Sequence, residues 1–252
     1  MELKPARSPG AQAGAGSMAG VVPGRPADVV LYRVWERPVR ITHWFMFLSV
    51  LTLCVTGYLI ARPPFSAPTE ASNSYVHGTI RYIHFVAAYV LLFSFLIRLY
   101  WGFVGNRFCR WSNMLPITRR RWQGIWVEID SLLFPWKGHY VYTGHAPLAS
   151  VIYLCAYAGV IVALGSGFIH YAQSHYSPFW RWVAGTGLSL FGYNLKVIHL
   201  VHHQMLWFFV VYFIAHIYMV AYTMGVSRTT EVDTMVTGRK FVHRDDLSPY
   251  DE

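Results

Sequence analysis

Charged residues are scarce in this chain of 252 residues: Asp, Glu, Lys and Arg make up 13% of it, while 54% is hydrophobic. A soluble domain carries about 25% charged residues, so the composition argues against a soluble enzyme, and its hydrophobicity excludes disorder. Cysteine is scarce too. The chain has three cysteines, Cys54, Cys109 and Cys155. Because the number is odd and two of them lie in apolar runs, they form no disulfide framework.

Long uncharged apolar runs are what the chain has instead. Four occur: Ile41 to Ala61, Tyr82 to Val104 with Arg98 near its end, about Ala146 to Ile169, and Val197 to Gly225. Each is long enough for a helix to cross a bilayer, which takes about 20 residues. None shows the alternation of a membrane β-barrel. The sequence therefore predicts an all-α membrane protein with a bundle of four transmembrane helices, in which Arg98 extends to the lipid interface.

The first 28 residues are rich in Gly, Ala and Pro and lack the apolar core of a signal peptide. We expect residues 1–28 to be a flexible tail, residues 29–226 to form the four-helix transmembrane domain, and residues 227–252 to be a cytoplasmic C-terminal tail.

The basic residues are distributed unevenly between the two sides of the predicted bundle. Seventeen of the 21 Lys and Arg residues lie before the first run, from Arg98 at the end of the second run to Lys137 before the third, or after the fourth. The positive-inside rule then predicts that both termini and the central loop are cytoplasmic, in a bacterial inner membrane. Topology thus explains the net charge of +9, and nothing else indicates nucleic-acid binding. Within the central loop, Trp122, Trp126, Ile129 and Leu133 recur at helical spacing, which predicts an interfacial helix across 119–134.

Histidines inside the apolar runs are the candidate site. Such ionisable groups are rare in membranes and usually functional. His43 follows Arg40 by three residues at the start of the first run, and His84 follows Arg81 by three at the start of the second. With the predicted topology, His43 lies near the inner face and His84 near the outer face.

The fourth run supplies the partners. His202 and His216 are 14 residues apart, about 40° short of whole helical turns, so they share one stripe about 21 Å long. His203 lies about 140° from His216 and His199 about 100° from it. The pattern therefore pairs His84 with His202 at the outer level, and His43 with His216 at the inner level.

Two imidazoles at each level favour bis-histidine ligation of two haems b in the bundle core. No carboxylate or thiolate lies at these depths to complete a zinc or copper site, and without a CxxCH motif the haems are not covalently attached. Arg40 and Arg81 are candidate partners of haem propionates, or simple interfacial anchors. Gly57, Gly102 and Gly159 can make room for a porphyrin or for close helix packing. A saturated bis-histidine iron has no open position, so the pattern favours electron transfer.

These residues resemble the di-haem cytochrome b subunit of membrane-bound nickel–iron (uptake) hydrogenases, over about residues 30 to 240. The matching stretches are LYRVWERPVRITHW at 31–44, VTGYLI at 55–60, IRYIHF at 80–85, RLYWGFVGNRF at 98–108, WQGIWVEI at 122–129, GHAP at 144–147, AHIYM at 215–219 and DTMVTG at 233–238.

The resemblance implies an electron path. The iron–sulfur chain of a periplasmic hydrogenase, with its small and large subunits, would supply the outer haem, then the inner haem, then membrane quinone. The subunit itself would do no hydrogen chemistry. The similar cytochrome of formate dehydrogenase binds quinone near the inner haem, which corresponds here to Thr143, Gly144 and His145.

Two other readings remain open at this point. A cytochrome b of another dehydrogenase, or a free-standing one, would keep the haems and change the partner. A His-lined metal or proton transporter would have no haem, and the absence of Asp and Glu from the four runs disfavours it. Aromatic residues between about His170 and Tyr193 would dock the partner or form an interfacial belt.

Overall fold

Four long helices organise the computed structural model, which describes residues 29–63, 75–134, 141–227, 231–243 and 247. They are α1 (Arg37–Ala61), α2 (Val76–Val104), α5 (Pro147–Ala172) and α7 (Leu195–Ser227). All four are long and apolar enough to cross a membrane. The structure is mostly helical and confirms the four predicted candidate membrane helices, although α2 begins six residues before Tyr82.

Apolar packing joins the four helices near their middle. One buried cluster takes residues from each of them: Val50, Leu91, Phe95, Val160, Leu164 and Phe209. Elsewhere large apolar side chains face outward, as Leu48 and Phe103 do with 54% and 73% of their surface exposed. Exposed apolar surface on that scale suits contact with lipid tails rather than water.

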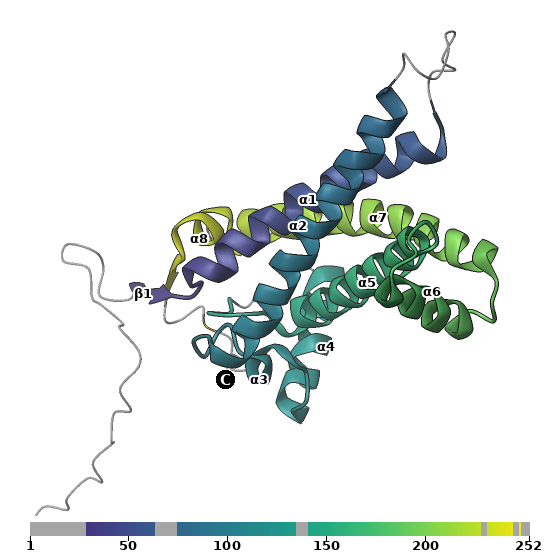
Figure 1. The fold of residues 1–252 in the computed structure, drawn as a ribbon. Helices are drawn as coiled ribbons and strands as arrows, with labels where there is room; N and C mark the ends of the chain where they lie inside the picture. The colour runs from purple at the N-terminus through teal and green to yellow at the C-terminus, as the bar shows by residue number, and fades with distance from the viewer. Residues whose placement is uncertain (1–28, 64–74, 135–140, 228–230, 244–246, 248–252) are drawn as a thin grey trace, which may run out of the picture.

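Shorter elements gather around this frame, as Figure 1 shows. Helix α3 (Trp111–Met114) and helix α4 (Arg119–Leu133) fill the connection between α2 and α5, α6 (Pro178–Leu190) packs beside α5, and α8 (Glu231–Thr237) follows α7. Strands β1 (Val29–Arg33) and β2 (Arg239–His243) pair antiparallel, with Leu31 opposite Phe241. The sequence patterns did not predict α6, α8 or the strand pair. Residues 1–28 lie outside the described part of the chain.

The start of α1 is tied to the ends of α2 and α8. Glu36 accepts hydrogen bonds from Trp101 Nε1 at 2.8 Å and from the backbone nitrogen of Asn106 at 2.9 Å. Gly238, at φ +81°, accepts from the Val34 nitrogen at 2.9 Å. A side chain at Gly238 would collide with the Trp35 carbonyl, so this close approach requires glycine. The ends of α1, α2 and α8 thus meet in one place.

Helix α4 confirms the helix predicted for the central loop. Its amphipathic pattern is inverted relative to that of a soluble helix, because aromatic side chains are exposed and charged side chains are buried. Its exposed face carries Trp122 and Trp126, 51% and 67% exposed. Its buried face is polar and includes Arg121 and Glu128. Thr118 begins the helix by accepting a hydrogen bond from the Arg121 nitrogen. Exposed tryptophans with buried charges suit a helix whose outer face meets lipid.

Arg98 corrects one expectation. It was predicted to extend to the lipid interface, but its side chain turns inward and is only 3% exposed. The guanidinium lies 5.9 Å from the Trp111 ring centroid, and Nη2 donates to Met114 Sδ at 3.8 Å. Tyr157 lies beside it. The aromatic and sulfur atoms of α3 and α5 give the cation a partly polar pocket, which explains why it does not extend outward.

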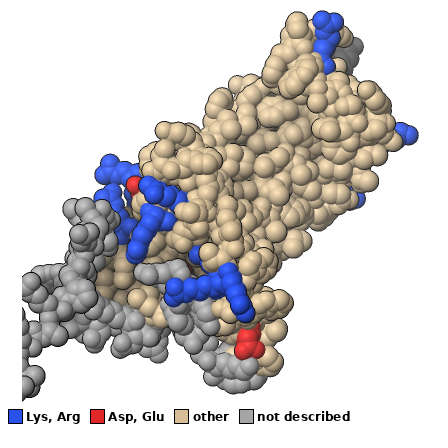
Figure 2. All heavy atoms as spheres, turned by 90° about the horizontal axis from the view of Figure 1, so that it is seen from below, with Lys and Arg blue, Asp and Glu red and all other residues tan. Residues whose placement is uncertain are grey.

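Basic side chains gather at one end of the molecule. Figure 2 shows most of the visible Lys and Arg residues near that end, while the long body is almost free of charge. Two buried polar contacts stabilise the same region. Lys240 Nζ donates to Glu231 at 2.6 Å and to the Tyr142 carbonyl at 2.9 Å. Glu128 accepts from the Leu148 nitrogen at 3.0 Å and so caps the start of α5.

Burial raises the pKa of Glu128 to about 7, against the opposing effects of the Leu148 hydrogen bond, Tyr142 and Arg121. An acid with a raised folded-state pKa loses stability as pH rises from its unfolded pKa to its folded pKa. We therefore expect Glu128→Gln to gain stability relative to the native protein between about pH 4.5 and pH 7, by at most about 3 kcal/mol. Thermal unfolding of the detergent-purified protein across this range measures it, and parallel pH profiles would contradict it.

Candidate functional site

The first histidine pair joins α2 to α7. The ring centroids of His84 and His202 lie 6.3 Å apart, with their planes inclined at 75°. Both side chains are partly buried. The prediction from helical rotation placed these two residues at one level, and the structure brings them together.

Two hydroxyl groups hold this pair. His84 Nδ1 lies 2.8 Å from Thr56 Oγ1, and His202 Nδ1 lies 3.0 Å from Ser166 Oγ. Each hydroxyl has a single hydrogen, and each donates it to a carbonyl of its own helix. Thr56 donates to the Thr52 carbonyl at 2.7 Å, and Ser166 donates to the Val162 carbonyl at 2.6 Å.

The tautomers of both histidines follow from this geometry. Since each hydroxyl hydrogen is already used, the oxygen accepts, and Nδ1 of each imidazole must be the N–H donor. The lone pair then lies on Nε2. A neutral imidazole with a free Nε2 lone pair is the form that binds a metal. The contacts with Thr56 and Ser166 therefore leave Nε2 of His84 and His202 as the nitrogens that can accept a metal or a hydrogen bond.

The second pair joins α1 to α7. The ring centroids of His43 and His216 lie 6.4 Å apart, with an interplanar angle of 48°. Tyr212 stacks on His216 at 5.7 Å and 11°. Nδ1 of His43 is buried and has no hydrogen-bond partner among the described residues. This pair was also predicted from rotation, but within the described part of the chain no hydroxyl bonds to it as at the first pair.

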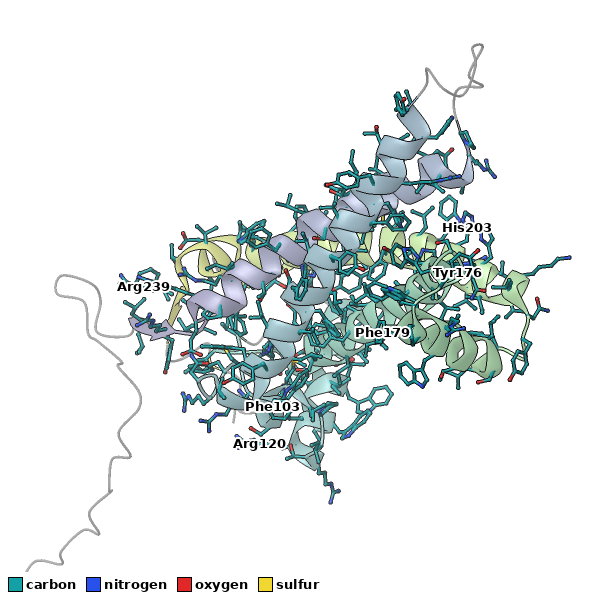
Figure 3. All side chains as sticks on the ribbon, viewed as in Figure 1. Phe103, Arg120, Tyr176, Phe179, His203 and Arg239 are labelled. Carbon is teal, nitrogen blue, oxygen red and sulfur yellow. The ribbon has the colours of Figure 1, made fainter. Side chains whose placement is uncertain are left out.

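The remaining histidines of α7 lie apart from these two pairs. No ring contact of His203 occurs among the described residues, and Figure 3 shows it on the opposite side of the view from Arg120. His199 contacts His170 of α5 at 5.5 Å, and His170 lies 6.1 Å from His202. His170 was not predicted near the site, because its neighbours come from the packing of α5 on α7.

The two candidate arginines differ in their surroundings. Arg40 donates through Nη1 to the Val236 carbonyl of α8, while its Nε is buried without a partner in the described structure. Arg81 is exposed. Arg40 thus links α1 to α8, and a role with a propionate remains a prediction for both residues.

The three candidate glycines fall into two groups, according to whether they border a histidine or another aromatic ring. A Cβ at Gly57 would lie 3.5 Å from His84 Cε1, so this glycine borders the first pair. A Cβ at Gly102 would collide with the Trp111 indole, and one at Gly159 with the Phe208 ring, so both allow close packing. Gly167, which the sequence patterns did not single out, resembles Gly57: its Cβ would lie 3.0 Å from His202 Cε1.

The segment Thr143, Gly144 and His145 lies beside the second pair. The His145 ring contacts Tyr153 at 5.3 Å, and Tyr153 contacts His216 at 6.4 Å. Trp35 packs against the other side of His145 at 4.7 Å. A chain of rings therefore connects this segment to the second pair. Spacing alone did not reveal Tyr153 or Trp35.

His145 has a fixed protonation state. Burial lowers its pKa to about 3, the charges of Arg98, Arg121 and Lys240 act in the same direction, and its bond to the Phe108 carbonyl opposes them. His145 is therefore neutral at physiological pH. Nδ1 donates to that carbonyl at 3.2 Å, so Nε2 is left as an acceptor.

A helical bundle with paired internal histidines defines a membrane protein of the cytochrome b type. Residues 34–238 match the family model described as prokaryotic cytochrome b561. A probable Ni/Fe-hydrogenase B-type cytochrome subunit of Azotobacter chroococcum mcd 1 is 38% identical over 208 residues, 81% of this chain and 86% of that protein. A probable Ni/Fe-hydrogenase 1 B-type cytochrome subunit of Escherichia coli (strain K12) is 34% identical over 222 residues, which cover 84% of this chain and 91% of that protein.

The chain therefore belongs to the prokaryotic cytochrome b561 family, together with these hydrogenase B-type cytochromes. The resemblance found in the sequence motifs is confirmed. Membership in a family of b-type cytochromes implies haem b as the cofactor.

Proposed function

We propose that this protein is the membrane subunit that carries electrons from the iron–sulfur chain of a periplasmic nickel–iron hydrogenase, through two haems b, to membrane quinone. The observation that carries the proposal is the presence of two histidine pairs at two levels of one bundle. The named relatives are hydrogenase cytochrome subunits, which supports the hydrogenase as partner. Both termini lie in the cytoplasm, as the distribution of basic residues favours.

The residues of each pair fit axial ligation. Two imidazoles on opposite sides of one metal, each about 2 Å from it through a ring nitrogen, have centroids roughly 6 to 6.5 Å apart. The measured values are 6.3 and 6.4 Å. His84 and His202 would hold the outer haem, and His43 and His216 the inner haem. A six-coordinate haem supplies one-electron transfer and no open site for substrate.

Quinone reduction belongs beside the inner pair. The rings of His145 and Tyr153 reach His216, and Thr143 and Gly144 precede His145. Nε2 of His145 accepts hydrogen bonds, so this residue would bind a quinol hydroxyl rather than a quinone carbonyl. Because its pKa is about 3, His145 does not deliver protons as an imidazolium at neutral pH.

Haem content tests the ligand assignment. We expect His202→Ala to lose the outer haem and leave about one haem per chain, because the removed imidazole is one of two axial ligands. His203→Ala is the matched control, since it changes the next residue of the same helix but neither pair. A pyridine haemochrome assay with a reduced-minus-oxidised spectrum measures both. Equal loss from the two variants would exclude the assignment.

The direction of electron flow predicts a membrane potential. Electrons that move inward and reduce quinone with cytoplasmic protons transfer charge across the bilayer, at about 2.3 kcal/mol per elementary charge for each 100 mV. Proteoliposomes with the whole hydrogenase complex should build a potential, negative on the cytoplasmic side, during hydrogen-dependent quinone reduction. A potential-sensitive dye measures it. An electroneutral reaction would disprove the path, as would failure of hydrogen to reduce the haems.

A further inference from the structure

The two histidine pairs differ in one respect that bears on electron transfer. Both imidazoles of the His84–His202 pair donate Nδ1–H to a hydroxyl oxygen. In the described structure, neither imidazole of the His43–His216 pair has such a bond, and the buried Nδ1 of His43 has no partner. The difference depends on Thr56 and Ser166, to which the sequence patterns assigned no role.

The two hydroxyls have equivalent surroundings. Each lies one residue before a glycine that faces the histidine ring, in the pairs Thr56–Gly57 and Ser166–Gly167. Each hydroxyl is buried, Thr56 with 6% and Ser166 with 3% of its surface exposed. Each is oriented by donating its hydrogen to its own helix backbone. Burial in an apolar bundle strengthens these bonds relative to water.

An N–H hydrogen bond on the far side of an imidazole increases the basicity of its other nitrogen. A more basic axial ligand stabilises the ferric form, so the reduction potential of the iron falls. Two such bonds act on the outer site and none among the described residues acts on the inner site.

Charge acts in the same direction. Only 3% of the surface of Arg98 is exposed. Arg98 lies six residues before the end of α2, and His43 lies six residues after the start of α1. Trp101 and Glu36 join these two helix ends. The charge of Arg98 acts on His145, whose ring contacts reach His216 through Tyr153. A buried cation on that side of the inner pair favours the reduced iron there, which raises its potential.

We propose that Thr56 and Ser166 are positioning residues that hold the reduction potential of the outer haem below that of the inner haem, through their hydrogen bonds to His84 and His202. The proposal rests on the haem ligation given under Proposed function. The resulting difference in reduction potential makes electron transfer from the outer to the inner haem favourable. The hydroxyls of Thr56 and Ser166, on the helices beside the outer ligands, thereby set the direction of electron flow.

The experiment is a potentiometric titration of the haem spectrum in the purified hydrogenase–cytochrome complex. We expect Thr56→Val and Ser166→Ala each to shift the outer haem to a higher potential, with a larger shift in the double variant, while the inner haem does not move. Thr56→Ser and Ser166→Thr keep the hydroxyl and should restore the native value. Thr223→Val is the control, because Thr223 donates to the Met219 carbonyl at 2.8 Å in the same way but has no histidine partner.

Assignment of the two potentials uses single-haem variants. The haem that remains in His43→Ala, the outer one, should titrate at a lower potential than the haem that remains in His84→Ala. This comparison also tests the proposal if the hydroxyl variants fail to assemble. Unchanged potentials in Thr56→Val and Ser166→Ala, or the reverse order in the single-haem variants, would overturn it. If the proposal fails but Thr56→Val and Ser166→Ala each still bind two haems per chain, the proposed function remains intact. A native protein that binds a number of haems other than two would refute the proposed function itself.

Discussion

Placing imidazoles inside an apolar helical bundle imposes one requirement on which much of this structure depends: each polar ring nitrogen needs a partner. At the His84–His202 level the chain meets half of that requirement with the hydroxyls of Thr56 and Ser166, and the Nε2 atoms remain for a metal. At the His43–His216 level the requirement is less completely met, and His43 Nδ1 stays buried alone in the described structure. The haem ligation proposed above would give a ring nitrogen of each of the four histidines a partner.

Buried charge at the basic end of the molecule presents the same problem in a different form. Arg121 is 6% exposed and spans three elements, because it donates to Asn113, to the His145 carbonyl at 3.1 Å and to Ser150 at 2.8 Å. Glu128 lies on the same face of α4 and caps α5. These contacts fix the 141–148 segment against α4. The position of His145 is therefore set both by these polar contacts and by the rings of Trp35 and Tyr153.

The parts that the sequence predicted share a physical basis in regular helical geometry. Run lengths identified four long helices, and 100° per residue distinguished His202 from His203 as the neighbour of His84. What the sequence did not predict depends on contacts between elements. Strand β2 pairs with β1 across almost the whole chain, Arg98 turns inward because α3 and α5 offer Trp111 and Tyr157, and Ser166 meets His202 only once α5 packs on α7.

The order of the polar contacts along the bundle gives a physical reason for the proposed direction of electron transfer. A neutral hydrogen-bond acceptor near an imidazole N–H stabilises the oxidised iron, and a cation stabilises the reduced iron. The chain places acceptors at the His84–His202 level and concentrates cations toward the His43–His216 level, where Arg98, Arg121 and Lys240 all act on His145. With the proposed topology these cations lie on the cytoplasmic side and would favour electrons arriving there, so topology and redox order would both arise from one distribution of charge.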